Sequence, residues 1–401
     1  MPEPRLYLDH NAGAPLRDCA RAAMIDALGR AGNPSSVHGE GRLARATVAA
    51  ARRAVAGLVG AAPATVTFTS GGSEAAATLL TPDWSYAGKP VRFDRLLVSA
   101  IEHAAVLKGG RFAPAAVEQV AVDRAGRLDL AALGSRLAAA SEAGERVLVA
   151  LMLANNETGV IQPVAEAAAL VHAAGGLLVC DAVQAAGRIP VDLGALGADA
   201  LLLSAHKFGG PQGAGAIVRA SELWSFAPLV TGGGQETYAR AGTENVAAIA
   251  GFGAAATAAA AEVATDGWDG RRERLEAAVL TATPDAVVFG AGAERLPNTL
   301  CFGVSGLGAE KATIAFDLAG IAVSSGSACS SGKVGPSHVL AAMGFDHDMA
   351  RSGIRVSFGL STTDADLERF LVVWRRIGAD FSRSAAPGNG DMSPRTGVRA
   401  A

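Results

Sequence analysis

Chemically reactive side chains follow five short apolar segments of the chain, with one group after each segment. In chain order these groups are a Ser/Gly-rich turn (69–74), Glu102-His103, Asn155-Asn156, Asp181 with Gln184, and Ser204-Ala205-His206-Lys207. Glycine lets a backbone approach a ligand closely, and the N–H groups at the start of a helix bind anions. Burial lowers the pKa of a lysine toward that of a nucleophilic amine, and a buried carboxylate is costly unless it is paired.

Together these groups predict a site for pyridoxal 5′-phosphate (PLP). Such a site needs an amine that binds the cofactor, an acid that holds a proton on the pyridine nitrogen, and an anion-binding turn for the phosphate. Each group alone is ordinary, because many strand-to-helix turns are rich in Gly and Ser and a histidine at a strand end more often has a structural role. The combination favours PLP chemistry, with Lys207 as the amine and Asp181 as the acid.

Composition shortens the list of candidate nucleophiles. Of the 35 basic residues only five are lysines (Lys89, Lys108, Lys207, Lys311 and Lys333), and the other 30 are arginines, which cannot act as free amines. Of the four cysteines, Cys180 and Cys301 lie inside apolar segments and Cys19 lies in a helix-like one. Cys329 alone lies in a Ser/Gly-rich segment (324–335), which favours a reactive thiol. No CxxC pair is present, so we expect no disulfide framework and no metal site.

Charge and hydropathy argue against several classes of protein. Half of the residues are apolar, 18% are charged and the formal net charge is −3, so neither wholesale disorder nor binding to nucleic acid or an anionic membrane is expected. The N-terminus lacks the apolar core of a signal peptide. The uncharged segment 246–261, rich in Ala and Gly, is short for a membrane span and predicts a buried helix. We therefore expect a soluble, cytoplasmic protein.

Strand-like and helix-like segments alternate from about residue 40 to residue 260. The predicted strands are 65–68, 95–99, 147–153, 176–181, 200–205 and 215–219, all continuously apolar, as in strands that are covered on both faces. Segment 42–59 carries apolar residues on one helical face and is followed by Gly60. This alternation predicts an α/β fold with a mostly parallel sheet. After about residue 265 the pattern changes to that of a smaller α+β region, in which Arg355 could bind a carboxylate or form an ordinary ion pair.

Nine ordered motifs resemble those of one known family. They are GNPSSVHGEGR (32–42), FTSGGSEA (68–75), EHAAV (102–106), NNETG (155–159), DAVQAAG (181–187), SAHKFGGPQG (204–213), RAGTEN (240–245), SSGSACSSG (324–332) and IRVSFG (354–359). The chain resembles the PLP-dependent cysteine desulfurases of the class V aminotransferase fold group, and its Cys329 segment resembles their long-loop branch.

The resemblance implies a PLP-transferase type I fold. A large PLP-binding α/β domain would span residues 16–262, and a small α+β domain, formed by residues 1–15 and 263–383, would carry the Cys329 segment. Residues 384–401 have little apolar content and are expected to form a disordered tail.

The resemblance also implies roles for individual residues. Lys207 would bind PLP covalently and move protons at the substrate Cα, Asp181 would hold the pyridine nitrogen, and His103 would stack on the ring. Cys329 would attack the substrate sulfur and become a persulfide. The remaining cofactor and substrate contacts would be Asn156 and Gln184 at the ring hydroxyl, Gly72, Ser73, Ser204 and His206 at the phosphate with Thr243 from a partner subunit, and Asn33 and Arg355 at the substrate carboxylate.

Cysteine desulfurase activity, with L-cysteine as substrate, is therefore the expected function. A homodimer and a sulfur-acceptor protein, such as one of iron–sulfur cluster assembly, are the expected partners. Two alternatives stay open: another PLP lyase or transferase of this fold, such as a selenocysteine lyase, and a non-catalytic sulfur-relay subunit. The chain departs from the family pattern at Gly13-Ala14, Ala76-Ala77 and Thr237-Tyr238, which leaves the substrate range, the rate and the sulfur acceptor open.

Overall fold

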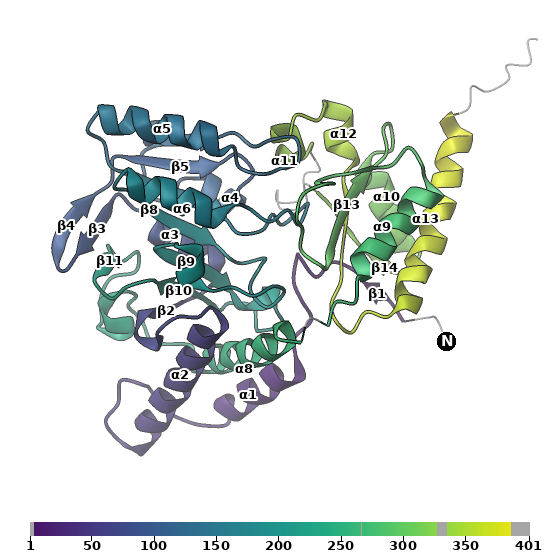
Figure 1. The fold of residues 1–401 in the computed structure, drawn as a ribbon. Helices are drawn as coiled ribbons and strands as arrows, with labels where there is room; N and C mark the ends of the chain where they lie inside the picture. Colours follow the sequence, from purple (N-terminus) through teal and green to yellow (C-terminus); the bar gives the residue numbers. More distant parts are fainter. Residues whose placement is uncertain (1–3, 266, 327–334, 386–401) are drawn as a thin grey trace, which may run out of the picture.

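The computed structural model describes residues 4–265, 267–326 and 335–385 (Figure 1). A seven-stranded sheet runs through the larger part of the molecule. Its strands lie in the order β2 (Val66–Thr69), β10 (Gly215–Arg219), β9 (Ala200–Ser204), β8 (Leu177–Asp181), β7 (Val147–Met152), β5 (Arg95–Ser99) and β6 (Val117–Val120). All six predicted strands are confirmed to within a few residues. The edge strand β6 was not predicted, because the sequence VEQV lacks a continuous apolar run.

The strand directions bring five strand ends to one edge of this sheet. β9, β8, β7, β5 and β6 pair in parallel, whereas β10 is antiparallel to both β9 and β2. Two reversals restore the direction, so β2 points the same way as β9. The predicted α/β class with a mostly parallel sheet is confirmed, and the carboxyl ends of β2, β5, β7, β8 and β9 lie at the same edge.

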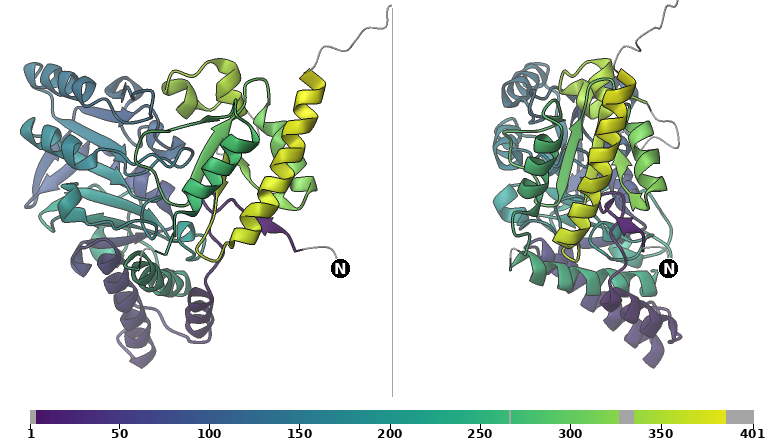
Figure 2. Two further views of the ribbon diagram at one scale, coloured as in Figure 1. Left: turned by 45° about the vertical axis from the view of Figure 1, so that its right-hand side comes forward. Right: turned by 90° about the vertical axis from the view of Figure 1, so that its right-hand side faces the viewer.

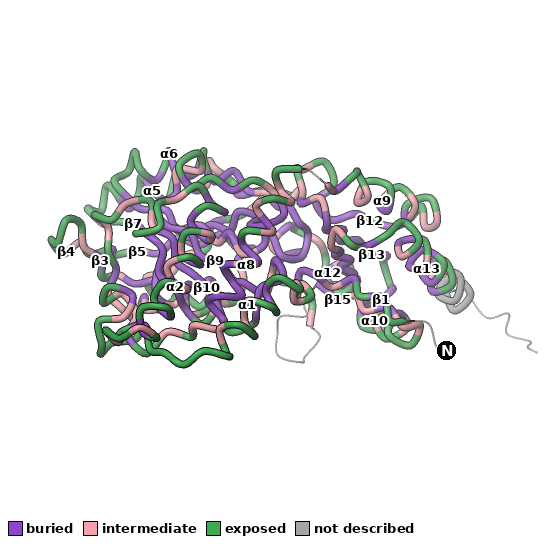
Figure 3. Tube along the Cα trace, turned by 90° about the horizontal axis from the view of Figure 1, so that it is seen from below, coloured by how far each residue is buried: buried purple, intermediate pink, exposed green. Residues whose placement is uncertain are grey.

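Helices and a small sheet cover the two faces of the large sheet. Along β7, Val149 and Leu151 pack into one hydrophobic cluster, whereas Leu148 and Ala150 pack into another on the opposite face. The first cluster includes residues of α1 (Asp18–Leu28), α2 (Gly39–Leu58), α5 (Leu130–Glu142), α6 (Val164–Ala173), α7 (Leu193–Leu196) and α8 (Val246–Val263). The second includes residues of α3 (Gly72–Leu79) and α4 (Ala104–Leu107). Figure 3 shows the buried interior in purple and the outer segments in green.

Two predicted helices are confirmed and pack against each other. The helix expected at residues 42–59 is α2, which begins earlier because the His38 ring accepts a hydrogen bond from the Gly41 N–H and caps its first turn. The Ala-rich segment 246–261 forms most of α8. By length and composition, α8 could cross a membrane, but half of it is buried inside the described part of the protein.

A third hydrophobic cluster lies in the smaller part of the molecule. Its four-stranded sheet has the order β12 (Val287–Val288), β13 (Thr299–Gly303), β16 (Ile354–Ser357) and β15 (Ser324–Ser325), and β1 (Leu6–Tyr7) pairs in parallel with β14 (Ile321–Ala322). The helices here are α9 (Arg271–Ala282), α10 (Ala309–Leu318), α11 (His338–Ala342), α12 (His347–Ser352) and α13 (Asp364–Ala385), with α13 on the side away from the large sheet (Figures 1 and 2). The division at residues 16 and 262 stays a prediction. The separate clusters of the two sheets support it, whereas a further cluster joins Ile101 and Met152 to Phe289, Cys301 and Val339 across it.

Three segments differ from the sequence expectations. Ser324 and Ser325, predicted as the start of a loop, form the buried strand β15 because they pair with β16. β3 (Asp83–Tyr86), β4 (Lys89–Arg92) and β11 (Trp224–Phe226) form a small sheet that the short, mixed sequences did not predict. α13 continues to Ala385, two residues into the predicted tail, and the rest of that tail lies outside the described residues.

Close packing of α2 on α8 depends on Gly253. A Cβ atom at this position would lie 2.5 Å from the Ala51 Cα, whereas a Cβ at Gly134 in α5 would meet no atom within 4 Å. We therefore expect Gly253→Ala to lower the free energy of unfolding by about 1–3 kcal/mol, because the helices must move apart. Gly134→Ala is the matched control and should raise it by about 0.5–1 kcal/mol through helix propensity alone. Urea denaturation measures both, and equal effects of the two substitutions would contradict the packing argument.

Candidate active site

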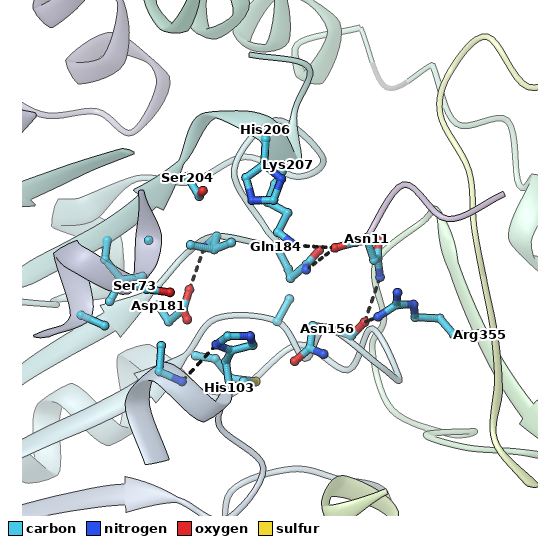
Figure 4. A pocket seen from close by; sticks show the side chains of 17 residues that line it. Asn11, Ser73, His103, Asn156, Asp181, Gln184, Ser204, His206, Lys207 and Arg355 are labelled. Atoms are coloured by element: carbon cyan, nitrogen blue, oxygen red, sulfur yellow. Dashed lines mark hydrogen bonds between the residues drawn. The ribbon is translucent and has the colours of Figure 1, made fainter. Parts of the chain in front are cut away.

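The five strand ends enclose a single cavity of about 220 Å³ (Figure 4). Ten of the thirteen predicted site residues line it: Gly72, Ser73, His103, Asn156, Asp181, Gln184, Ser204, His206, Lys207 and Arg355. Asp181 is the last residue of β8, and Lys207 lies in a short turn (Ala205–Lys207) that follows β9. Because β8 and β9 are parallel neighbours, the acid and the amine reach the same cavity.

The Asp181 carboxylate is largely withdrawn from water. Its Oδ1 accepts a hydrogen bond of 2.9 Å from the Val183 N–H. Burial raises the pKa of Asp181 to about 6, although this hydrogen bond and the charge of Lys207 lower it. At neutral pH the group is therefore mostly ionised, and it favours a positive charge beside it.

The Lys207 amine is held by the backbone of the N-terminal segment. Its Nζ donates to the Asn11 carbonyl at 2.7 Å and to the Ala12 carbonyl at 3.1 Å. The Asn11 carbonyl also accepts a hydrogen bond of 3.0 Å from the Gln184 Nε2. The N-terminal segment, far from Lys207 in the sequence, thus fixes the position of the Lys207 amine.

The first turn of α3 lines the cavity and leaves little space beside its backbone. Gly72 begins the helix, and a Cβ there would lie 3.3 Å from a Val183 methyl group and 3.5 Å from the Ser204 Cβ. Ser73 and Ser204 add hydroxyl groups to the cavity wall. Burial, together with the charges of Lys207 and Arg188, lowers the pKa of His206 to about 4, so this ring is neutral at neutral pH. N–H groups, hydroxyls and a neutral imidazole suit a phosphate group.

His103 caps a helix and also lines the cavity. Its Nδ1 accepts a hydrogen bond of 3.2 Å from the Ala105 N–H and caps α4. Burial lowers the pKa of His103, as do the charges of Lys207 and His338, so the ring is neutral. With Nδ1 as the acceptor, the proton of the neutral ring is on Nε2.

Arg355 reaches the cavity from β16 and is ion-paired. Its guanidinium lies 2.7 Å from the Asp9 Oδ1 and donates to the Asn156 carbonyl at 2.9 Å. The Arg355 Nε, also buried, has no hydrogen-bond partner in the described part of the chain. Arg355 therefore forms an ordinary ion pair and also lines the cavity. Its role in binding a substrate carboxylate stays a prediction.

Three predicted site residues lie elsewhere. Cys329 is outside the described residues. Thr243 is exposed and lines a separate recess beside Phe68 and Arg240. Asn33 is exposed, and its Oδ1 accepts a hydrogen bond of 2.9 Å from the Ser35 N–H, outside the lining of the cavity.

Sequence reasoning did not assign Asn11, Asp9 or Arg188 to the site. Asn11 lines the cavity, Asp9 pairs with Arg355, and Arg188 contacts the Lys207 carbonyl. The only available signal was the polar run Asp9-His10-Asn11 directly after an apolar pair. Of the departures from the family motifs, Ala76 lines the cavity, whereas Thr237 and Tyr238 line another recess and have left-handed backbones (φ 54° and 65°).

The chain is similar to characterised enzymes over nearly its whole length. The family model for class V aminotransferases matches residues 6–370. The chain belongs to the class V aminotransferase family. It is 43% identical to a cysteine desulfurase of Cereibacter sphaeroides over 96% of this chain and 98% of that protein. An IscS-like cysteine desulfurase of Mycobacterium tuberculosis is 35% identical over 92% of this chain and 94% of its own length.

Solved structures agree with this assignment. A NifS-like protein from Rickettsia africae has a TM-score of 0.83 and 32% identity, covering 94% of this chain and 99% of that one. The structure of SspA in complex with cysteine has a TM-score of 0.69 and 25% identity, covering 88% and 98%. The PLP-transferase fold and the resemblance to PLP-dependent cysteine desulfurases are confirmed. The cavity fits the cofactor of this family, because a carboxylate, an amine and an anion-binding helix start face one space.

A buried carboxyl group beside the cavity, Glu157, gives a pH-dependent prediction. Its Oε2 accepts a hydrogen bond of 2.5 Å from the Ser337 hydroxyl. Burial raises the pKa of Glu157 from 4.5 to about 7, although Ser337 and Arg355 lower it. The native state therefore keeps a proton that the unfolded chain has lost, and stability falls as the pH rises from 4.5 to 7.

Glu157→Gln should remove this loss. We expect the variant to be roughly as stable as the wild type at pH 4.5 and more stable, by roughly 3 kcal/mol, at pH 8. Urea denaturation at both pH values gives the difference. A difference that is the same at both pH values would show that Glu157 does not titrate in this range.

Proposed function

We propose that this cysteine desulfurase converts L-cysteine to L-alanine and transfers the sulfur to Cys329, which becomes a persulfide. The observation that carries the proposal is that Lys207, Asp181 and Arg355 all line one cavity, with Arg355 at its edge. The similarity of the chain to cysteine desulfurases over nearly its whole length also supports the proposal. The related SspA structure is a complex with cysteine, which supports the choice of substrate.

The cavity residues would divide the binding of PLP among them. Lys207 would hold it covalently, Asp181 would keep a proton on the pyridine nitrogen, and the neutral His103 ring would stack on its face. Gly72, Ser73, Ser204 and His206 would bind the phosphate. The bound cofactor supplies electron withdrawal from the substrate Cα. Because the pKa of Asp181 is about 6, the carboxylate is ionised at neutral pH and can stabilise the protonated ring.

Arg355, which lines the cavity, would orient the substrate through its carboxylate. A guanidinium binds a carboxylate in a fork, and its buried position strengthens that interaction. Lys207 would then move a proton at the substrate Cα, since its Nζ lies at the strand-end turn that opens into the cavity. Asn156 and Gln184 would contact the ring hydroxyl.

The sulfur transfer balances without an external oxidant. The Cys329 thiolate attacks the substrate sulfur and forms an S–S bond as the substrate C–S bond breaks. The electron pair of the broken bond stays with the carbon fragment, which takes up a proton and leaves as L-alanine. L-Cysteine and a thiol thus give L-alanine and a persulfide, whose outer sulfur can pass to an acceptor thiol.

The remaining functional assignments depend on partners. Thr243 is exposed, as expected if it reaches the phosphate of a partner subunit in a homodimer. A persulfide on a Ser/Gly-rich segment suits delivery to an acceptor protein, and we propose iron–sulfur cluster assembly in the cytoplasm as its destination. A selenocysteine lyase is the second candidate, since the apolar Ala76 lines the cavity where the family motif carries a polar residue.

The Cys329 assignment is testable by substitution. Cys329→Ala should reduce L-alanine formation from L-cysteine to below about 1% of the wild-type rate, because the sulfur loses its acceptor. Mass spectrometry of the Cys329 peptide from wild-type protein treated with L-cysteine should show one added sulfur. Cys19→Ala is the matched control, since Cys19 is an exposed thiol that does not line the cavity. Undiminished sulfur mobilisation by Cys329→Ala would refute the assignment.

Asp181 provides a second test. Asp181→Asn keeps the shape but removes the negative charge, so the pyridine nitrogen loses its proton and turnover should fall by roughly 10²- to 10³-fold. The variant should still bind PLP through Lys207, and its visible spectrum should respond more slowly to L-cysteine. Cofactor content and L-alanine formation measure the two effects. A non-catalytic relay subunit would instead show a wild-type spectrum that L-cysteine leaves unchanged.

A further inference from the structure

Arg188 is a buried cation directly behind the cavity. Only 5% of its surface is exposed, and it lies one turn beyond Gln184 in the segment that follows β8. Its Nη1 donates to the Gln184 carbonyl at 2.8 Å and to the Gln184 Oε1, and its Nη2 donates to the His10 carbonyl at 3.2 Å and the Lys207 carbonyl at 3.3 Å. Within the described part of the chain all its acceptors are carbonyl or amide oxygens, and none is a carboxylate.

These contacts determine the orientation of the Gln184 amide. A guanidinium carries donors only, so the atom of Gln184 that faces Arg188 must be the oxygen. The NH₂ group is then on the other side, toward the cavity that Gln184 lines, and it donates to the Asn11 carbonyl at 3.0 Å. An NH₂ group has two hydrogens, so one remains for a ligand in the cavity.

The same guanidinium joins three segments that build the site. It holds the carbonyl of His10, next to Asn11, and the carbonyl of Lys207 itself. The Asn11 carbonyl in turn accepts from both the Lys207 Nζ and the Gln184 Nε2. Burying a cation without a carboxylate partner costs folding free energy. The position of Arg188 is therefore not explained by a contribution to the stability of the fold alone.

We propose that Arg188 is a positioning residue that holds Gln184 with its NH₂ group toward the cavity, so that a hydrogen-bond donor faces the ring oxygen of PLP. The proposal rests on the proposed function in that PLP occupies this cavity. A donor beside an ionised oxygen stabilises the charge, and it competes for the proton that the oxygen shares with the Lys207 nitrogen. Arg188 thereby lowers the pH at which that proton is lost.

A double-mutant cycle on the bound cofactor tests the proposal. The visible absorption band is titrated with pH, without L-cysteine, in the wild type, Arg188→Met, Gln184→Ala and the double variant. Arg188→Met should raise the midpoint by about one pH unit, and so should Gln184→Ala. In the Gln184→Ala background, Arg188→Met should add less than about a third of that shift, because its effect passes through Gln184.

Controls separate orientation from charge and from stability. Arg111 likewise has no carboxylate among its acceptors in the described residues, donates to the backbone carbonyls of Thr78, Ala227 and Pro228, and lies outside the cavity lining, so Arg111→Met should leave the midpoint unchanged. Gln184→Glu keeps a partner for Arg188 and puts an oxygen in place of the NH₂ group, and it should also raise the midpoint. If Arg188→Met does not fold, the midpoint of Gln184→Glu still tests the proposal.

Two results would overturn the proposal. An equal shift from Arg188→Met in both backgrounds would mean that Arg188 acts by its charge alone, and an unchanged midpoint in Arg188→Met or Gln184→Glu would mean that the amide does not donate into the cavity. The titration needs no substrate, so these results are independent of L-alanine formation. Absence of a visible band from the wild-type protein would count against the proposed function itself.

Discussion

The free-energy cost of a carboxylate at the end of an apolar strand is the constraint on which the site depends. Asp181 ends β8 with its carboxylate withdrawn from water, and burial raises its pKa to about 6. The Val183 N–H and the charge of Lys207 oppose this rise, and a protonated pyridine ring would oppose it further. The parallel pairing of β8 with β9 provides that compensation, because it places the Lys207 turn beside the acid.

Burial, as well as ion pairing, decides which side chains around the cavity are charged and which are neutral. Arg188 is buried among carbonyl groups, and Arg355 is buried against Asp9. Burial raises the pKa of Glu102 well above its usual value, an effect that the charge of Asp181 strengthens, so the proton is favoured on Glu102 over Asp181. His206 and His103 are neutral. The cavity thus combines one ionised acid with cations on its far side, which suits a zwitterionic substrate and an anionic cofactor.

The sequence predicted the large sheet and the chemistry at its edge more completely than the connections between distant segments. Continuously apolar strands are covered on both faces, so residues at and after their ends had to meet at one edge, as nine of the ten predicted site residues in the cavity do; the tenth, Arg355, comes from β16. The contact of Asn11 with Lys207 and that of Asp9 with Arg355 depend on where the N-terminal segment lies relative to the large sheet and β16. No local sequence pattern indicates that placement. β15 was missed because two serines become a strand only through pairing with β16. The amide orientation imposed by Arg188 likewise requires three-dimensional contacts.

Covalent labelling of the lysines tests most directly that the strand ends create the reactive amine. The protein is loaded with PLP, reduced with borohydride, digested and analysed by mass spectrometry for a pyridoxyl group. The chain has five lysines, and only Lys207 lies in the cavity with Asp181 in the described structure. Modification confined to the Lys207 peptide is the predicted result. Modification of Lys89, Lys108, Lys311 or Lys333 instead, or of no lysine, would contradict the assignment of this cavity as the cofactor site.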